Sequence, residues 1–176
     1  NLSTGEPYFK PYVILKKEGI SIAVLGLITP SVPTWLPPEL YSGIEFRDML
    51  ETAQKFMPEI LQKKPDLVVG LFHSGWNDNP EFYREPQPMN ENGASSVVWN
   101  VPGFDIVFTG HDHRLANQKF ANKDGDTVLV LNAGSRSENV AVAEVLLKGS
   151  EKRIKGNILE TKDFQPDKDF LTKFEN

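Results

Sequence analysis

The stretch Gly103–Arg114, which reads GFDIVFTGHDHR, constrains the fold of this chain more than any other. It begins with a run of β-forming residues and reaches Gly110, where the backbone can bend sharply because no Cβ is in the way. His111 and His113 follow, on either side of Asp112. The pattern predicts a buried strand whose carboxyl end brings two imidazoles to the edge of a sheet, where ligands bind in open α/β folds.

The third histidine of the chain, His73, also ends an apolar run, Asp66–His73, and is followed by Ser74 and Gly75. All three histidines therefore stand at the ends of strand-like segments. Neutral imidazole is a common ligand for borderline metals, which makes the three histidines candidate metal ligands. The alternative is that each is a packed or hydrogen-bonded side chain, because sequence spacing fixes no distance between His73 and the His-x-His pair.

Apolar patterns along the chain predict an α/β fold. We expect strands at Tyr12–Lys17, Ile20–Ile28, Leu67–His73, Phe104–Thr109, about Gln118–Ala121, Thr127–Leu131, Val140–Lys148 and Lys152–Thr161. The first two are joined by a hairpin-like turn at Glu18-Gly19. The near-continuous apolar run Leu67–His73 suits a parallel strand that is covered on both faces.

A helix with one apolar face is predicted to open at Asp48, whose Asp-x-x-Glu spacing resembles a capping box. Pro58 should kink this helix and Pro65 should stop it. A short helix from Gly93 to about Asn100, capped by Asn92, and a terminal helix or linker at Asp167–Phe174 complete the helical segments. Two stretches are predicted to be irregular, the proline-rich Thr29–Pro38 and the long polar loop Trp76–Met89.

Composition limits the classes of function. The formal net charge of −5 and the lack of a Lys/Arg cluster argue against a nucleic-acid-binding surface. No apolar run approaches the ~18 residues of a membrane-spanning helix. Because the chain has no cysteine, any metal must be held by imidazole, carboxylate or carbonyl groups.

The motif order of the chain resembles a known family. LFHSG followed by GFDIVFTGHDHR is similar to the second half of a calcineurin-like metallophosphoesterase, with its strand-end His and its Gly-His-x-His motif. More narrowly, IAVLGLITPSVPTWLP followed by DMLETAQKFMPEILQKKPDLVVGLFHSG resembles the bacterial 5′-nucleotidase and 2′,3′-cyclic-nucleotide 2′-phosphodiesterase branch. The ordered series covers nearly the whole chain and is more specific than any one motif.

The resemblance implies an α/β fold with mixed sheets and covering helices, namely the second half of an αββα sandwich. Residues 1–163 would be the C-terminal half of the catalytic domain, and 164–176 a terminal helix or linker towards a following domain. The motifs that precede this segment in the family (Asp-x-His, Gly-Asp-x-x-Asp and Gly-Asn-His-Asp/Glu) do not occur, and the chain has neither an initiator Met nor a signal peptide. We therefore expect a piece of a longer protein that is periplasmic, exposed at the cell surface or secreted.

The resemblance also implies a site and a reaction. His73 and His111 would bind one divalent metal and His113 a second, the two ions being zinc, manganese or iron. The catalytic residues and the remaining ligands would come from the N-terminal half of the same domain. The parent protein would hydrolyse nucleotide phosphoesters, with a separate C-terminal domain that binds the nucleotide. The loop Asn132–Ser135 resembles the family's glycine-bearing loop near the metals, although it also fits a plain strand connection.

Several alternatives stay open. The isolated chain could be a catalytically inactive metal-binding or interaction fragment, or the histidines could be structural parts of a binding module. Trp35 is favoured as a packing residue, although the resemblance places its loop near the rim of the active site. An exposed sheet face could make the fragment a homodimer, unless the loop Thr29–Pro38 folds over that face.

Overall fold

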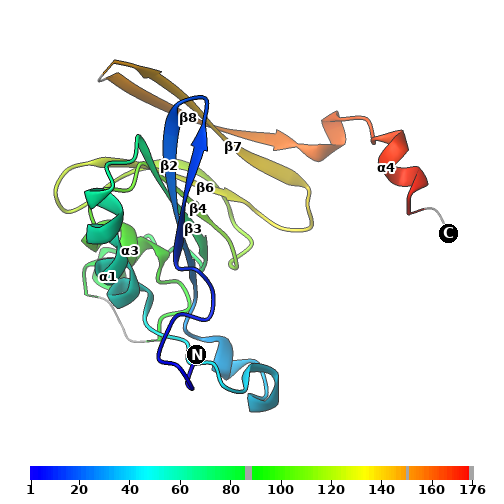
Figure 1. The fold of residues 1–176 in the computed structure, drawn as a ribbon. Helices are drawn as coiled ribbons and strands as arrows, with labels where there is room; N and C mark the ends of the chain where they lie inside the picture. The colour runs from blue at the N-terminus through cyan, green and yellow to red at the C-terminus, as the bar shows by residue number, and fades with distance from the viewer. Residues whose placement is uncertain (86–88, 150, 175–176) are drawn as a thin grey trace.

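A computed structural model of the chain describes residues 1–85, 89–149 and 151–174 (Figure 1). Its strands are β1 (Tyr12–Lys17), β2 (Ile20–Ile28), β3 (Leu67–His73), β4 (Ile106–Thr109), β5 (Leu115–Ala121), β6 (Thr127–Ala133), β7 (Asn139–Lys148) and β8 (Glu151–Glu160). Its α-helices are α1 (Met49–Gln62), α2 (Pro80–Arg84), α3 (Ala94–Asn100) and α4 (Lys168–Thr172). The predicted α/β class with a mixed sheet and covering helices is confirmed.

Six strands form one mixed sheet in the order β1-β2-β3-β4-β6-β5, and β7 and β8 form a second, two-stranded sheet. The inner strands β2, β3, β4 and β6 run parallel, and the edge strands β1 and β5 pair antiparallel with their neighbours. The predicted turn between β1 and β2 is confirmed, because Glu18 and Gly19 have φ angles of 52° and 81°. Two successive residues with positive φ form the hairpin turn that matches the twist of the strands.

One face of the large sheet is covered by α1 and α3 (Figure 1). Asp48 begins α1 by accepting a hydrogen bond from the amide of Glu51 at 3.0 Å, as its capping-box spacing predicted. The helix continues through Pro58 and ends before Pro65. Its buried positions recur at helical spacing and pack on the sheet, and they are Met49, Ala53, Phe56, Met57 and Ile60.

The hairpin β7–β8 covers only part of the opposite face. Its alanine, valine and isoleucine side chains pack against Ile106, Leu129 and Leu131 of β4 and β6. Over β1–β3 the described residues leave the same face open, and Leu15 and Leu71 are 52% and 58% exposed. The loop Thr29–Pro38 therefore does not shield these two side chains.

Several predicted boundaries need correction. The segment Trp76–Met89 is not wholly irregular, because Asn79 caps the short helix α2 within it; residues 86–88 lie outside the described ranges. Asn92 does not cap α3: the N-cap is Gly93, without a side-chain bond. The proline-rich loop Thr29–Pro38 contains one short 3₁₀ turn, Val32–Thr34, and a second, Pro38–Tyr41, begins at its last residue.

The end of the chain follows its prediction more closely. Asp167 caps α4 by accepting a hydrogen bond from the amide of Phe170, and the helix extends away from the sheets (Figure 1). No helix within residues 1–85, 89–149 and 151–174 is long and apolar enough to cross a membrane.

Candidate metal centre

The parallel pairing of β3 and β4 brings two of the candidate histidines together. Phe72 pairs with Thr109, so the residues that follow, His73 and Gly110, lie side by side at the carboxyl edge of the sheet. The rings of His73 and His111 have their centroids 5.2 Å apart, at an angle of 66°. The sequence spacing fixed no distance between His73 and the His-x-His pair, and the structure places the ring of His73 beside that of His111. His113 lies exposed on the same turn.

The turn that carries the two histidines has an unusual backbone. His111 and His113 have φ angles of 75° and 59°, in the left-handed region that non-glycine residues seldom occupy. Asp112, between them, holds the turn in place. Its two carboxylate oxygens accept hydrogen bonds from the amide of Trp76 at 2.9 Å and from the side-chain amide of Asn132 at 2.8 Å.

Asp112 therefore points into the protein while the histidines flank it, a role that the sequence did not reveal. Asn132 itself is almost fully buried, with 2% of its surface exposed. Its side-chain oxygen accepts a hydrogen bond from the amide of Gly134. The loop Asn132–Ser135 consequently lies against the histidine turn, where the resemblance placed it.

The pKa of His73 is lowered from its ordinary value, first by partial desolvation and then by the positive charges that His111 and His113 would carry. A lowered pKa favours the neutral imidazole, which is the form that donates a lone pair to a metal. The surroundings of His73 therefore favour the form of its ring that can bind a metal.

His111 has two further partners that the sequence did not single out. Its Nε2 lies 2.6 Å from Oε1 of Glu91, and the indole of Trp35 stacks on its ring with centroids 4.8 Å apart and an angle of 22°. Trp35 was favoured as a plain packing residue, but the structure places it on a candidate ligand rather than in the core, with 45% of it exposed. No pattern around Glu91 marked it, because it stands in an irregular segment.

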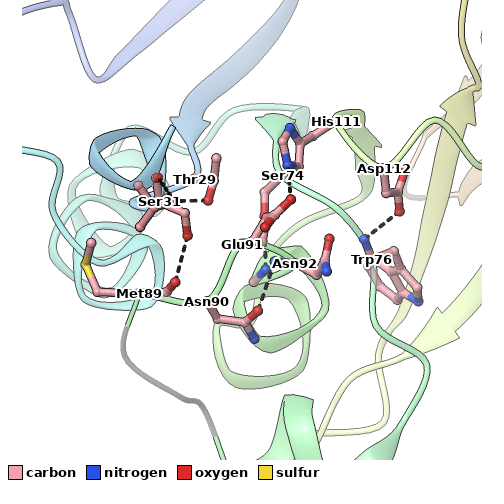
Figure 2. A network of polar contacts seen from close by, with 12 residues as sticks. Thr29, Ser31, Ser74, Trp76, Met89, Asn90, Glu91, Asn92, His111 and Asp112 are labelled. Carbon is pink, nitrogen blue, oxygen red and sulfur yellow. Dashed lines mark hydrogen bonds and ion pairs between the residues drawn. The ribbon is translucent and has the colours of Figure 1, made fainter. Parts of the chain in front are cut away.

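The segment that carries Glu91 is fixed to the end of β3 (Figure 2). The hydroxyl of Ser74 donates to the backbone carbonyl of Glu91 at 2.8 Å and accepts from the amide of Gly93 at 3.0 Å. Gly75 fits between this segment and the histidine turn. A Cβ added to it would lie 1.8 Å from Oδ1 of Asn92 and 2.9 Å from Cβ of Asp112, so only glycine is accommodated.

The donor set fits a borderline divalent metal in type but is incomplete. His73 and His111 are adjacent and offer imidazole nitrogens, which suit zinc, manganese or iron. Within the described ranges, no group of three or more His, Asp or Glu side chains could hold a metal ion. The arrangement can therefore contribute part of a metal site, and a full coordination shell would require donors beyond this cluster.

No protein-family model matches the chain, whereas individual proteins do. It is 39% identical over 128 residues to the 2′,3′-cyclic-nucleotide 2′-phosphodiesterase/3′-nucleotidase of Haemophilus influenzae, an alignment that covers 67% of the chain and 19% of that protein. With the 5′-nucleotidase of Vibrio cholerae it shares 37% identity over 112 residues, which cover 62% of the chain and 19% of the relative. The chain thus spans about a fifth of the length of these curated relatives.

Solved structures share the fold. The calcineurin-like phosphoesterase YfkN from Bacillus subtilis superimposes with a TM-score of 0.77 at 19% identity, over 98% of the chain and 57% of that structure. The 5′-nucleotidase precursor from Thermus thermophilus gives a TM-score of 0.70 at 24% identity, over 98% of the chain and 35% of that structure.

Proposed function

This chain belongs to the calcineurin-like phosphoesterases, in the branch of bacterial 5′-nucleotidases and 2′,3′-cyclic-nucleotide phosphodiesterases, and on that premise we propose that it supplies part of a two-metal centre for nucleotide phosphoester hydrolysis. The observation that carries the proposal is the adjacency of the His73 and His111 rings at the carboxyl edge of the large sheet. Ligand sites of open α/β sheets lie at that edge.

In this proposal His73 and His111 hold one divalent ion and His113 a second, the ions being zinc, manganese or iron. Such ions supply Lewis acidity towards phosphoryl oxygens and lower the pKa of a bound water. The residues of this chain orient and present donors: the lowered pKa of His73 favours its neutral form, Asp112 anchors the turn, and Trp35 covers the ring of His111. The catalytic acid and the bridging carboxylate come from another segment of the parent protein.

We extend the proposal to the parent protein because the curated relatives are about five times as long as the aligned segment. Residues 1–163 form the C-terminal half of a catalytic domain and pack against its N-terminal half. Residues 164–176, including the protruding α4, lead to a C-terminal domain that binds the nucleotide. The parent protein works in the periplasm, at the cell surface or after secretion, in nucleotide catabolism.

A second candidate function concerns the chain by itself. Within its described ranges, no cluster of three candidate ligands is present, which favours a catalytically inactive metal-binding or interaction fragment when the chain is isolated. The uncovered face with Leu15 and Leu71 supports self-association of that fragment. Contiguous apolar patches beyond several hundred Å² are rare on soluble monomers, and ~25 cal/mol per Å² favours covering them.

An activity assay tests the main proposal. The parent protein should hydrolyse 5′-mononucleotides, 2′,3′-cyclic nucleotides or a nitrophenyl phosphodiester when Mn²⁺ or Zn²⁺ is added, and lose turnover in a chelator. Absence of metal-dependent turnover on all three substrates would contradict it. The isolated chain should be inactive, and turnover by it that disappears in His111→Ala would contradict the assignment of the catalytic residues to another segment.

A further inference from the structure

Glu91 contacts a proposed metal ligand without belonging to the ligand set. Its Oε1 lies 2.6 Å from Nε2 of His111, a short distance that indicates a charge-assisted hydrogen bond. An ionised carboxylate only accepts hydrogen bonds, so Nε2 of His111 must carry the proton. In the neutral imidazole, the free lone pair then lies on Nδ1.

The position of Glu91 is defined by the strand that carries the other ligand. Its backbone carbonyl accepts hydrogen bonds from the hydroxyl of Ser74 at 2.8 Å and from the amide of Gly75 at 3.4 Å. These two residues directly follow His73, and Figure 2 shows the side chain of Glu91 pointing toward the ring of His111. Glu91 therefore links the end of β3, through its backbone carbonyl, to the histidine turn, through its carboxylate.

A second contact restricts the same ring from another direction. Trp35 stacks on the face of His111, while Glu91 holds its edge at Nε2. A ring that is held at one edge and covered on one face has little freedom to rotate. The side chain of His111 is only 18% exposed, in agreement with this confinement.

We propose that Glu91 is a positioning residue that fixes the orientation and the Nε2–H tautomer of His111, so that His111 offers Nδ1 to the metal. Carboxylates that accept the second ring N–H of a ligating histidine set its tautomer and raise its basicity. The role in metal binding rests on the proposed function, whereas the hydrogen bond and the tautomer do not.

Nuclear magnetic resonance of the isotopically labelled, metal-free chain at mildly alkaline pH tests the tautomer directly. We expect the His111 ring to carry its proton on Nε2 and this proton to exchange slowly with water. Glu91→Ala should abolish the slow exchange, and Glu91→Gln should retain much of it because an amide oxygen still accepts. The exposed Glu81 provides the matched control, and Glu81→Ala should leave the His111 signals unchanged.

A proton on Nδ1 of His111 in the wild type, or signals unaffected by Glu91→Ala, would overturn the proposal. The backbone amide spectrum shows whether Glu91→Ala folds. If it does not fold, the spectra of the wild type and of Glu91→Gln still decide which ring nitrogen of His111 carries the proton.

Calorimetric titration with Zn²⁺ separates the positioning role from the proposed function. Glu91→Ala should weaken zinc binding about 10–100-fold, the usual effect of losing such a carboxylate, and Glu91→Gln should weaken it less. Unchanged zinc affinity in Glu91→Ala would contradict the positioning of the ligand. If the wild-type chain binds no zinc, the result counts against the metal centre of the proposed function. The contact of Glu91 with His111 is then tested by the resonance experiment alone.

Discussion

Replacing Asp112 tests whether this residue organises the histidine turn from inside the protein. Its carboxylate accepts hydrogen bonds from the amide of Trp76, from the side-chain amide of Asn132 and, at 3.2 Å, from the amide of Arg114. All three partners are donors. Asp112→Ala leaves them without an acceptor, and Asp112→Asn places an amide NH₂ opposite one of the two buried donors.

The magnitude follows from the burial of the partners. Trp76 and Asn132 are 6% and 2% exposed, so water cannot easily replace the carboxylate. Hydrogen bonds to charged groups contribute about 1.5–3 kcal/mol each, and after discounting for the partly exposed Asp112 we expect Asp112→Ala to lower the free energy of unfolding by roughly 2–4 kcal/mol. For a chain of this size the melting temperature should fall by about 4–16 °C.

Urea and thermal unfolding, followed by circular dichroism, measure the effect. Asp112→Asn should be destabilised less than Asp112→Ala but clearly more than Asp124→Ala, a control in an exposed turn. The two Asp112 variants should also bind Zn²⁺ more weakly, because the turn that presents the imidazoles is no longer anchored. Stability of Asp112→Ala within about 0.5 kcal/mol of the wild type would refute the reasoning, since that range is typical of surface substitutions without a role.

Three further predictions follow from other contacts. Gly75→Ala should lower the free energy of unfolding in a urea titration, because the added Cβ would lie 1.8 Å from Oδ1 of Asn92. Gly26→Ala is the control and should be tolerated, because a Cβ there would have no atom within 4 Å. Leu71→Glu should keep the chain monomeric in sedimentation velocity at concentrations where the wild type associates; a wild type that is monomeric throughout would rule out the homodimer. The pKa of Asp66 is lowered below 3.8 by hydrogen bonds from the backbone and side chain of Ser21, so its ionised form stabilises the fold. This contribution to stability is present at pH values above the pKa of Asp66 in the unfolded chain, and it is lost as the pH falls through the lower pKa of Asp66 in the folded chain. The urea midpoints of the wild type and Asp66→Asn should therefore differ at neutral pH and converge in acid.

The sequence predicted the parts of the fold that depend on local periodicity. The ranges of β1, β2 and β3 agree with their apolar runs, because two-residue alternation and buried parallel strands leave clear patterns. The capping interaction of Asp48 was equally visible, since it is made within one turn of helix. The short helix α2 was missed because proline and polar residues dominate its segment.

The candidate site was predictable only in outline. The strand-end positions of His73 and His111 marked both as candidate ligands, but the spacing between them fixed no distance, because it does not tell that β3 and β4 are parallel neighbours in the sheet. The inward role of Asp112 and the contact of Glu91 with His111 depend on partners many residues away in the chain, Asn132 and Ser74 among them. Such tertiary hydrogen bonds leave no periodic signal in the sequence.

The metal content of the purified parent protein tests the central claim most directly. Mass spectrometry should find two divalent ions per wild-type molecule after removal of loosely bound metal. His73→Ala and His111→Ala should each lose the same ion, His113→Ala should lose the other, and Glu81→Ala should retain both. Undiminished metal content in all three histidine variants would contradict the account.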